Sequence, residues 1–297
     1  MKNRNLRTLI VPVAVGALCV ALGGHALADD TNAIAVVKVG DAGNKDDGTG
    51  FGAVAYEYKI GKYEVTWKEF CEFLNGVAKT DTHHLYESRM ADEGDYPGGI
   101  TRSGEAGSYT YTVKTGWEKK PVGFVTWETC IRFANWLTNG KGKGDTETGS
   151  YTIKDNVVKL PDHAVLAAGK TTNWVVASES EWYKAGYYDP KKTGGAGYWT
   201  YPVKSDSPPE ASIGNGAPTD VGSYTNAVSA YGTLDQAGNV WEYMENRTDG
   251  KVGLRGGSWH INDNDNYERS STRYDVLSAK WPHYGFRVVA LGGAAAK

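Results

Sequence analysis

After its first 30 residues the chain has no long apolar run, no excess of positive charge and only two cysteines. The missing apolar run argues against a membrane span in the mature protein. The 32 lysine and arginine residues are outnumbered by 35 aspartate and glutamate residues, and no basic stripe is present, which argues against a nucleic-acid partner. Cys71 and Cys130 lie in segments with helical spacing, and we interpret them as small buried apolar side chains. A disulfide between them stays open at this stage.

Histidine is too scattered to predict a preformed metal site. No two of the 6 histidines stand four residues apart on an expected helix, the spacing that places two imidazoles on one face. His83 and His84 are adjacent, so they cannot easily share one face of a regular element. An iron site assembled from His163, His260 and His283 stays open beside the simpler interpretation of surface or core histidines.

The N-terminus has the pattern of a cleavable export signal. Lys2, Arg4 and Arg7 precede an apolar run from Leu9 to Gly24, and Ala28 ends a small-x-small cleavage pattern. The run is shorter than the roughly 20 residues that span a bilayer, so a retained anchor is the less favoured interpretation. Cleavage removes three basic side chains and changes the formal charge from −3 to −6. We expect an exported protein, periplasmic or secreted.

The remaining composition favours a loop-rich fold. With 38 glycines, 19 tyrosines and 10 tryptophans, the chain can make many tight turns closed by large flat side chains. We expect a signal peptide at 1–28, a leading segment at 29–50, one domain at 51–290 and a short tail at 291–297.

Three helices are predicted from their start signals. Thr66 is followed three residues later by Glu69, which makes a capping box, and helical apolar spacing follows. A second helix is predicted to start in the same way at Thr126, and a third starts at Ser178 with Glu181 closing its box.

Short strands and long loops are predicted elsewhere. Enrichment in β-branched and aromatic residues predicts strands or turn-strand units at Ala53 to Lys59, Tyr63 to Val65, Gly232 to Tyr243, Leu254 to Trp259 and Tyr284 to Val289. Polar, glycine-rich loops are predicted at Thr82 to Ser108, Lys141 to Ser150 and Lys191 to Pro218. Loops this long in a compact domain are usually functional or held by special contacts.

Six short motifs follow one another between about residues 50 and 290. They are Tyr63-Glu64-Val65-Thr66, Pro121-Val122 with Val125-Thr126-Trp127, Ser178-Glu179-Ser180-Glu181-Trp182, Gly238-Asn239-Val240-Trp241-Glu242-Tyr243, Leu254-Arg255-Gly256-Gly257-Ser258-Trp259, and Arg269 and Arg273 with Gly285-Phe286-Arg287. In this order they resemble the formylglycine-generating enzyme, or sulfatase-modifying factor, family. The resemblance implies an α+β, C-type-lectin-like fold with few helices, short strands and long loops.

The resemblance also implies a chemistry whose ligands are missing here. Enzymes of that family oxidise a substrate cysteine to formylglycine with copper held by two cysteines after the Gly-Gly-Ser unit, because Cu(I) prefers soft thiolates. In this chain Ile261 stands where the first cysteine is expected, and Asp265 or a neighbour stands where the second is expected. Neither supplies sulfur, so we expect neither copper nor copper-thiolate oxidase activity.

A structural calcium ion is expected from the same resemblance. The implied ligands are the side chains of Asp235 and Glu242 and the backbone of Gly238 and Val240, around a tight turn whose oxygens suit a hard cation. The alternative is an ordinary turn in which Glu242 pairs with an arginine.

The polar stretch from His260 to Tyr274 is a candidate recognition surface. The resemblance implies that retroelement-diversified proteins with the same fold place their variable ligand-binding residues in this stretch. The candidate binding residues are Ser258 and six side chains that we expect to be exposed, namely Trp259, His260, Asp263, Asp265, Tyr267 and Tyr274. The alternative is a solvated loop.

The arginines of the motifs are predicted to be structural. Arg255, Arg269, Arg273 and Arg287 can each tie several loop carbonyls or a carboxylate in place, and an anion clamp is the alternative. The sequence therefore favours a binding or structural module for an unidentified protein, peptide or small-molecule ligand. The alternative function is an oxidoreductase that uses a different set of metal ligands.

Overall fold

Two four-stranded sheets organise the chain. The computed structural model describes residues 33–209, 211, 216–260 and 267–293, and Ile34–Lys297 form one compact unit. The first sheet is antiparallel, in the order β1 (Val36–Val39), β2 (Tyr58–Gly61), β14 (Val288–Leu291) and β7 (Asn173–Val176). The leading segment 29–50 thus contributes the edge strand β1, and β14, near the end of the chain, lies in the same sheet.

The second sheet brings the last motifs together. Its order is β12 (Tyr274–Leu277), β11 (Lys251–Arg255), β10 (Trp241–Thr248) and β13 (Tyr284–Gly285), and only β13 runs parallel to its neighbour. Glu242 on β10 lies opposite Arg255 on one side and Gly285 on the other. Three motifs far apart in the sequence therefore meet around one residue.

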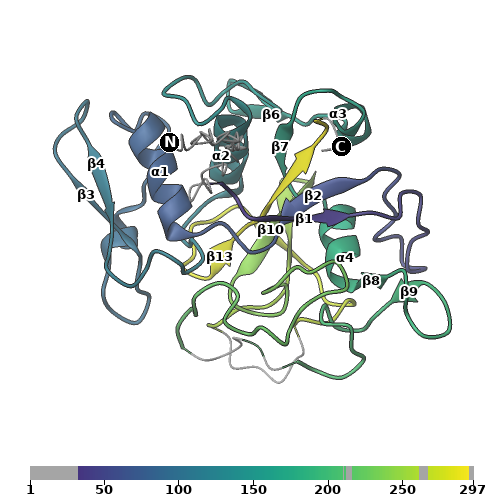
Figure 1. The fold of residues 1–297 in the computed structure, drawn as a ribbon. Coiled ribbons are helices and arrows are strands. Elements are labelled where there is room, and N and C mark those ends of the chain that lie inside the picture. Colours follow the sequence, from purple (N-terminus) through teal and green to yellow (C-terminus); the bar gives the residue numbers. More distant parts are fainter. Residues whose placement is uncertain (1–32, 210, 212–215, 261–266, 294–297) are drawn as a thin grey trace, which may run out of the picture. The chain divides into compact units, whose positions relative to one another are not determined.

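In the described residues, four α-helices and one 3-10 turn pack around the sheets (Figure 1). They are α1 (Trp67–Val77), η1 (Ser88–Ala91), α2 (Trp127–Thr138), α3 (His163–Ala167) and α4 (Glu179–Tyr187). In the view of Figure 1, α1 and α2 lie on one side of the first sheet and α4 on the other. No helix in the described part of the chain has both the length and the apolarity to cross a bilayer.

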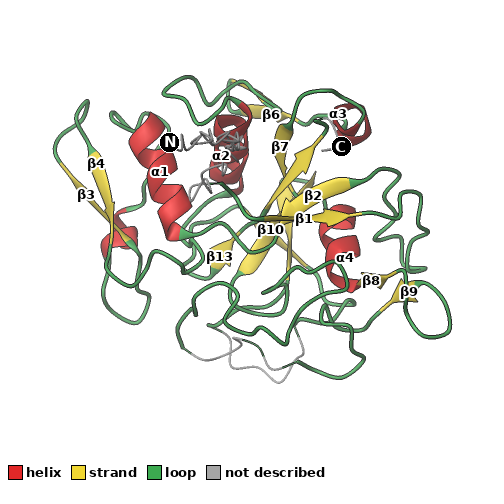
Figure 2. Cartoon of the chain, in the orientation of Figure 1, coloured by secondary structure: helices red, strands yellow, loops and turns green. Residues whose placement is uncertain are grey.

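Small hairpins interrupt the long loops, which make up much of the fold (Figure 2). The hairpins are β3 (Ile100–Ser103) with β4 (Thr110–Val113), β5 (Thr152–Lys154) with β6 (Val157–Lys159), and β8 (Tyr188–Asp189) with β9 (Gly197–Tyr198). Two of the stretches predicted as plain loops, 82–108 and 191–218, therefore contain paired residues.

The three predicted helix starts are confirmed. Thr66 and Ser178 each cap their helix in a complete box, since the side chain accepts from the N3 amide while Glu69 or Glu181 accepts from the cap amide. Thr126 also caps α2, but residue N3 is Thr129, so only one half of the box is present. The prediction for α2 is therefore confirmed for the cap at Thr126 and wrong for the carboxylate at N3, where Thr129 stands.

The predicted strands are placed less well. Residues 53–57 and 63–65 are irregular, and only Tyr58–Gly61 of this region forms a strand. The predicted closing strand is two short strands, β13 and β14, separated by Phe286 and Arg287. Both side chains at this break are fully buried.

Both remaining cysteines are buried in the helices that flank the aromatic core. Phe73 and Phe133 pack edge-on at 5.4 Å between ring centroids, and Phe133 meets Phe286 at 5.3 Å. Cys71 and Cys130 are free thiols on α1 and α2. The interpretation of both as buried apolar side chains is confirmed, and no disulfide joins them.

Candidate functional site

The Gly-Gly-Ser-Trp motif ends β11 and is fixed against the Gly-Asn-Val-Trp motif. Gly238 donates its amide to the carbonyl of Gly256 at 2.7 Å, and Trp259 donates its amide to the carbonyl of Asn239 at 2.9 Å. Gly256 has φ +105°, and a Cβ there would lie 3.3 Å from the carbonyl oxygen of Gln236. The glycine is needed because the two motifs approach one another by their backbones.

Some candidate binding residues are buried rather than exposed. Trp259 is 1% exposed and Tyr267 is 8% exposed, so the expectation that both face solvent is wrong. The ring of Tyr267 packs on Trp241 at 5.4 Å, while Trp259 lies edge-on to His283 at 6.3 Å. Burying an aromatic ring in the protein interior is more favourable than leaving it exposed to water.

The other candidate binding residues divide into three groups. Ser258 is fully buried. His260 and Tyr274 are exposed, as expected. Asp263 and Asp265, together with the position of Ile261, lie outside the described residues.

A row of four rings from three separate segments reaches the surface beside this motif. His260 and His283 stack face to face, with centroids 4.5 Å apart and planes within 5°. Tyr96 lies against the outer side of His260 at 5.2 Å, and Trp281 lies against His283 at 6.2 Å. We call these four residues the aromatic ladder. Tyr96 and Trp281 are 47% and 49% exposed, so the ladder presents two large amphipathic side chains to solvent.

The buried member of the ladder, His283, is uncharged near neutral pH. Burial, and then the neighbouring His260, lower the pKa of His283 to about 4. Within residues 33–209, 211, 216–260 and 267–293, no hydrogen-bond partner is found for the buried Nδ1 of His283 or the buried indole Nε1 of Trp259. Sequence reasoning missed Tyr96 and Trp281, because neither belongs to a motif and their proximity depends on the tertiary fold.

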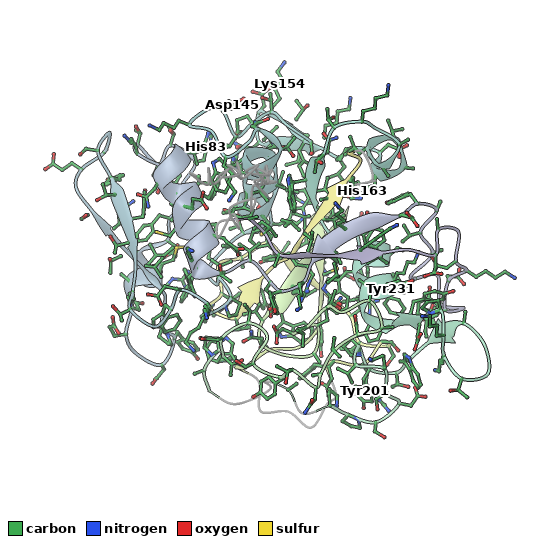
Figure 3. The ribbon with its side chains drawn as sticks, in the orientation of Figure 1. His83, Asp145, Lys154, His163, Tyr201 and Tyr231 are labelled. Atoms are coloured by element: carbon green, nitrogen blue, oxygen red, sulfur yellow. The ribbon has the colours of Figure 1, made fainter. Side chains whose placement is uncertain are left out.

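Of the three histidines considered for an iron site, His260 and His283 stack on one another, whereas His163 is engaged elsewhere. His163 Nδ1 lies 3.0 Å from Glu181 and its Nε2 lies 2.8 Å from Glu245, so both ring nitrogens are occupied on α3 (Figure 3). Among the described residues no three His, Cys, Asp or Glu side chains converge as metal ligands would.

A buried charge cluster surrounds the residues proposed for calcium. Arg287 donates two hydrogen bonds of 2.7 Å to the two carboxylate oxygens of Glu242, and both residues are fully buried. Trp182 adds a third donor to Glu242 at 2.8 Å. Glu242 therefore pairs with an arginine, which the alternative interpretation expected.

Two further carboxylates belong to this cluster. Asp235 is 4% exposed, accepts from the amide of Gly222 at 2.6 Å, and has its pKa raised to about 6 by burial. Glu64 is 2% exposed, and neither of its carboxylate oxygens has a hydrogen-bond partner in the described part of the chain. Burial, and then the nearby Asp235, hold the pKa of Glu64 well above its usual range.

Among the described residues, the carboxylates of the charge cluster do not converge on one point as the ligands of a cation would. Three carboxylates lie near one guanidinium, which leaves an excess of negative charge and of acceptor oxygens. Glu242 already accepts three hydrogen bonds from Arg287 and Trp182, whereas neither oxygen of Glu64 has a partner among the described residues. A buried unpartnered carboxylate costs free energy unless it is protonated or paired with a cation.

Two of the other motif arginines, Arg255 and Arg273, hold carboxylates or carbonyls within the fold, as predicted. Arg255 and Arg273 both donate to Glu179 at the start of α4, at 2.7 Å and 2.8 Å. Arg255 also donates to the carbonyls of Ser270 and Thr272. These donors are engaged within the fold, which argues against an anion clamp at Arg255.

The two thiols are poorly suited to metal or redox chemistry. Burial raises the pKa of Cys71 to about 11 and that of Cys130 well above its usual range. Cys71 Sγ lies 3.3 Å from the carbonyl of Tyr111, and Cys130 Sγ lies 3.1 Å from that of Thr126. The thiolate, which is the metal ligand and nucleophile, is therefore disfavoured at both positions.

Comparison with known proteins identifies the scaffold. Residues 30–291 match the family model described as the sulfatase-modifying factor enzyme 1-like domain. A comparison with curated proteins gives no match.

Solved structures share the fold at low sequence identity. The crystal structure of CarF is 16% identical, with a TM-score of 0.52 over 87% of this chain and 98% of that chain. Treponema denticola variable protein 1 is 16% identical, with a TM-score of 0.51 over 86% of this chain and 94% of that chain. PvdO from Pseudomonas aeruginosa is 18% identical, with a TM-score of 0.48 over 86% and 90%. The first two likenesses show that the expected α+β architecture is present.

Proposed function

Because this chain belongs to the family of sulfatase-modifying factor enzyme 1-like domains, we propose that it is an exported binding module on that scaffold, without copper-thiolate oxidase activity. The proposal of export rests on the N-terminal pattern that ends at Ala28. The proposed lack of oxidase activity rests on the missing cysteines near Ile261 and Asp265 and on the high pKa values of the two buried thiols.

The aromatic ladder is the observation that supports a binding role. Large side chains that are half exposed cost solvation free energy in a free monomer, and aromatic residues are enriched where proteins bind partners. His260 and His283 hold Tyr96 and Trp281 in a row by ring contacts of 4.5 to 6.2 Å. Because the rings are already fixed, little side-chain entropy is lost when a partner binds.

A peptide segment is the ligand that we propose for the ladder. Tyr96 Oη lies 3.3 Å from His260 Nε2, so the surface offers polar atoms as well as ring faces. Such a mixture suits a peptide that carries an apolar side chain beside backbone amides. A protein loop or a small molecule of the same chemistry would use the same contacts.

Selection from a random peptide library tests this role. The wild-type chain and a Tyr96→Ser/Trp281→Ser variant would be immobilised and screened in parallel. We expect sequences that enrich on the wild type to be lost on the variant, while near-UV circular dichroism shows that the variant is folded. Equal enrichment on both proteins would contradict the proposal.

We also propose a structural calcium ion in the charge cluster. The resemblance assigns it to Asp235, Gly238, Val240 and Glu242, and the unpartnered Glu64 supports a carboxylate contribution from that residue. The ion would neutralise the buried negative charge and hold the loop of Gly222, whose amide is bound by Asp235.

The alternative of an oxidoreductase with other metal ligands makes a different prediction. Metal analysis of the purified chain would then find stoichiometric iron or copper, whereas our proposal predicts calcium alone.

A further inference from the structure

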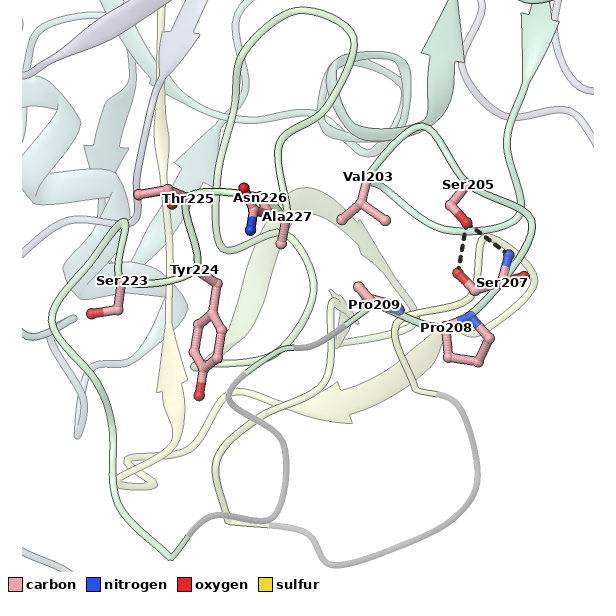
Figure 4. A pocket seen from close by; sticks show the side chains of 10 residues that line it. All are labelled: Val203, Ser205, Ser207, Pro208, Pro209, Ser223, Tyr224, Thr225, Asn226 and Ala227. Atoms are coloured by element: carbon pink, nitrogen blue, oxygen red, sulfur yellow. Dashed lines mark hydrogen bonds between the residues drawn. The ribbon is translucent and has the colours of Figure 1, made fainter.

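A pocket of about 430 Å³ opens between two loops that belong to none of the sequence motifs (Figure 4). One wall is the loop 203–209 and the other is the loop 223–227. Figure 4 shows Pro208 on one side and Tyr224 on the other. The volume lies within the range of about 300–1,000 Å³ that is usual for small-molecule sites.

The lining of this pocket is polar but uncharged. It contains the hydroxyl side chains of Ser207 and Thr225, the amide of Asn226 and the ring of Tyr224, and no Asp, Glu, Lys, Arg or His belongs to the described residues that line it. Asp206 stands in the middle of one wall, yet its carboxylate turns to Thr200, from which it accepts hydrogen bonds of 2.9 Å and 2.8 Å.

Hydrogen bonds within the loops fix both walls. Ser205 accepts the amide of Ser207 at 2.9 Å and donates to its carbonyl at 3.0 Å, which closes a tight turn. On the other wall, Ala227 donates its amide to the carbonyl of Tyr224 at 2.9 Å. A ligand would therefore meet a site whose backbone is already ordered, which lowers the entropic cost of binding.

We propose that this pocket binds a neutral saccharide. Each sugar hydroxyl both donates and accepts, as do the hydroxyl and amide groups of the lining. The C–H face of a sugar ring can pack on Tyr224, and the carbons of Val203 and Pro208 supply apolar contact opposite. Among the described residues of the lining a charged ligand finds no counter-ion, so it would lose hydration without compensation from them.

Saturation-transfer NMR on the full mature chain tests the proposal with defined probes. The neutral probes are cellobiose, maltose, lactose and N,N′-diacetylchitobiose, and the charged counterparts are glucuronic acid and glucosamine. We expect transfer to at least one neutral disaccharide and none to the charged sugars. In titrations, Tyr224→Ala and the milder Asn226→Ala are each expected to weaken that binding by about tenfold or more.

The matched control is Trp281→Ala, which removes an aromatic side chain from the aromatic ladder and leaves the pocket intact. It is expected to leave saccharide affinity within about twofold. The same variant is expected to lose peptides in the selection described above, so failure of one proposal is distinguishable from failure of the other. The inference is overturned if no neutral disaccharide shows transfer, if the charged sugars bind as well, or if both pocket variants bind like the wild type.

Discussion

At the scale of single residues, the interior of this protein depends on a few buried charges. His163 lies between Glu181 on α4 and Glu245 on β10, and Tyr151 donates to Glu245 at 2.6 Å. Burial alone would lower the pKa of His163, but Glu181 and then Glu245 outweigh burial and raise it to about 10. The imidazolium therefore joins α3, α4 and β10.

This network predicts a pH dependence of stability. In the unfolded chain a histidine titrates near 6.5, so between about pH 6.5 and 10 the folded state holds a proton that the unfolded state has lost. The stability contributed by His163 is complete below pH 6.5 and declines as the pH rises through about 10, by about 1.4 kcal/mol for each pH unit at most. Urea unfolding from pH 6 to 10 should show this slope in the wild type.

His163→Gln should remove that slope and destabilise the fold by roughly 3–5 kcal/mol at pH 6, because Glu181 and Glu245 are left without a cation. His83→Gln is the control, since His83 meets Glu147 at 3.5 Å with a 40% exposed side chain. Curves for His163→Gln and wild type that run parallel with pH would contradict this account.

The calcium proposal is also decided by individual carboxylates. Chelation with EDTA, or Asp235→Ala, is expected to lower the Tm of the wild type by several degrees, because the buried negative charge loses its counter-ion. Glu64→Gln should reduce the response to EDTA, since one unpartnered carboxylate is removed. Differential scanning calorimetry measures both effects, and an unchanged melting curve with EDTA would exclude the ion.

At the scale of secondary-structure elements, local signals were readable from the sequence and non-local ones were not. The caps at Thr66 and Ser178 are encoded within four residues, so the helices starting there were predictable. Strand β2 is defined by its partners β1 and β14, which lie far away in the chain, and its bounds could not be read from local composition. The strand β7 was missed for the same reason, whereas α3 was missed although Asp162 caps it locally.

The cap of α1 provides a test at this scale. Thr66→Ala removes the acceptor of the Glu69 amide and the donor to its carboxylate, and should destabilise the protein by about 1 kcal/mol. Ser103→Ala is the control, because Ser103 bonds only to Thr110 on an exposed hairpin and should change stability by less than about 0.5 kcal/mol. If both variants lost the same free energy of unfolding in denaturant titrations, the capping box would make no particular contribution to stability.

At the scale of the whole molecule, the order of the motifs predicted the fold because each motif supplies contacts to another. Glu242 and Arg287 come from different motifs and form one buried pair. The surface was less predictable, since Tyr96, His260 and Trp281 are neighbours only in the folded chain. Burial of Trp259 and Tyr267 was likewise hidden, because a polar neighbourhood in sequence does not reveal which rings turn inward.

The positions of the two thiols bear on whether the chain can hold copper. Both are sealed into helices that build the core, and no soft ligand stands at positions 261 or 265. The scaffold of the family is therefore present with its aromatic core and motif contacts, while the sulfur ligands for copper are missing from the expected positions.

The most direct measurement is mass spectrometry of a Cys-x-Pro-x-Arg peptide after incubation with the copper-loaded chain under oxygen. We predict that the cysteine is recovered unchanged and that no aldehyde forms above the level seen with copper alone. Conversion to formylglycine that disappears in Cys71→Ala or Cys130→Ala would contradict the account.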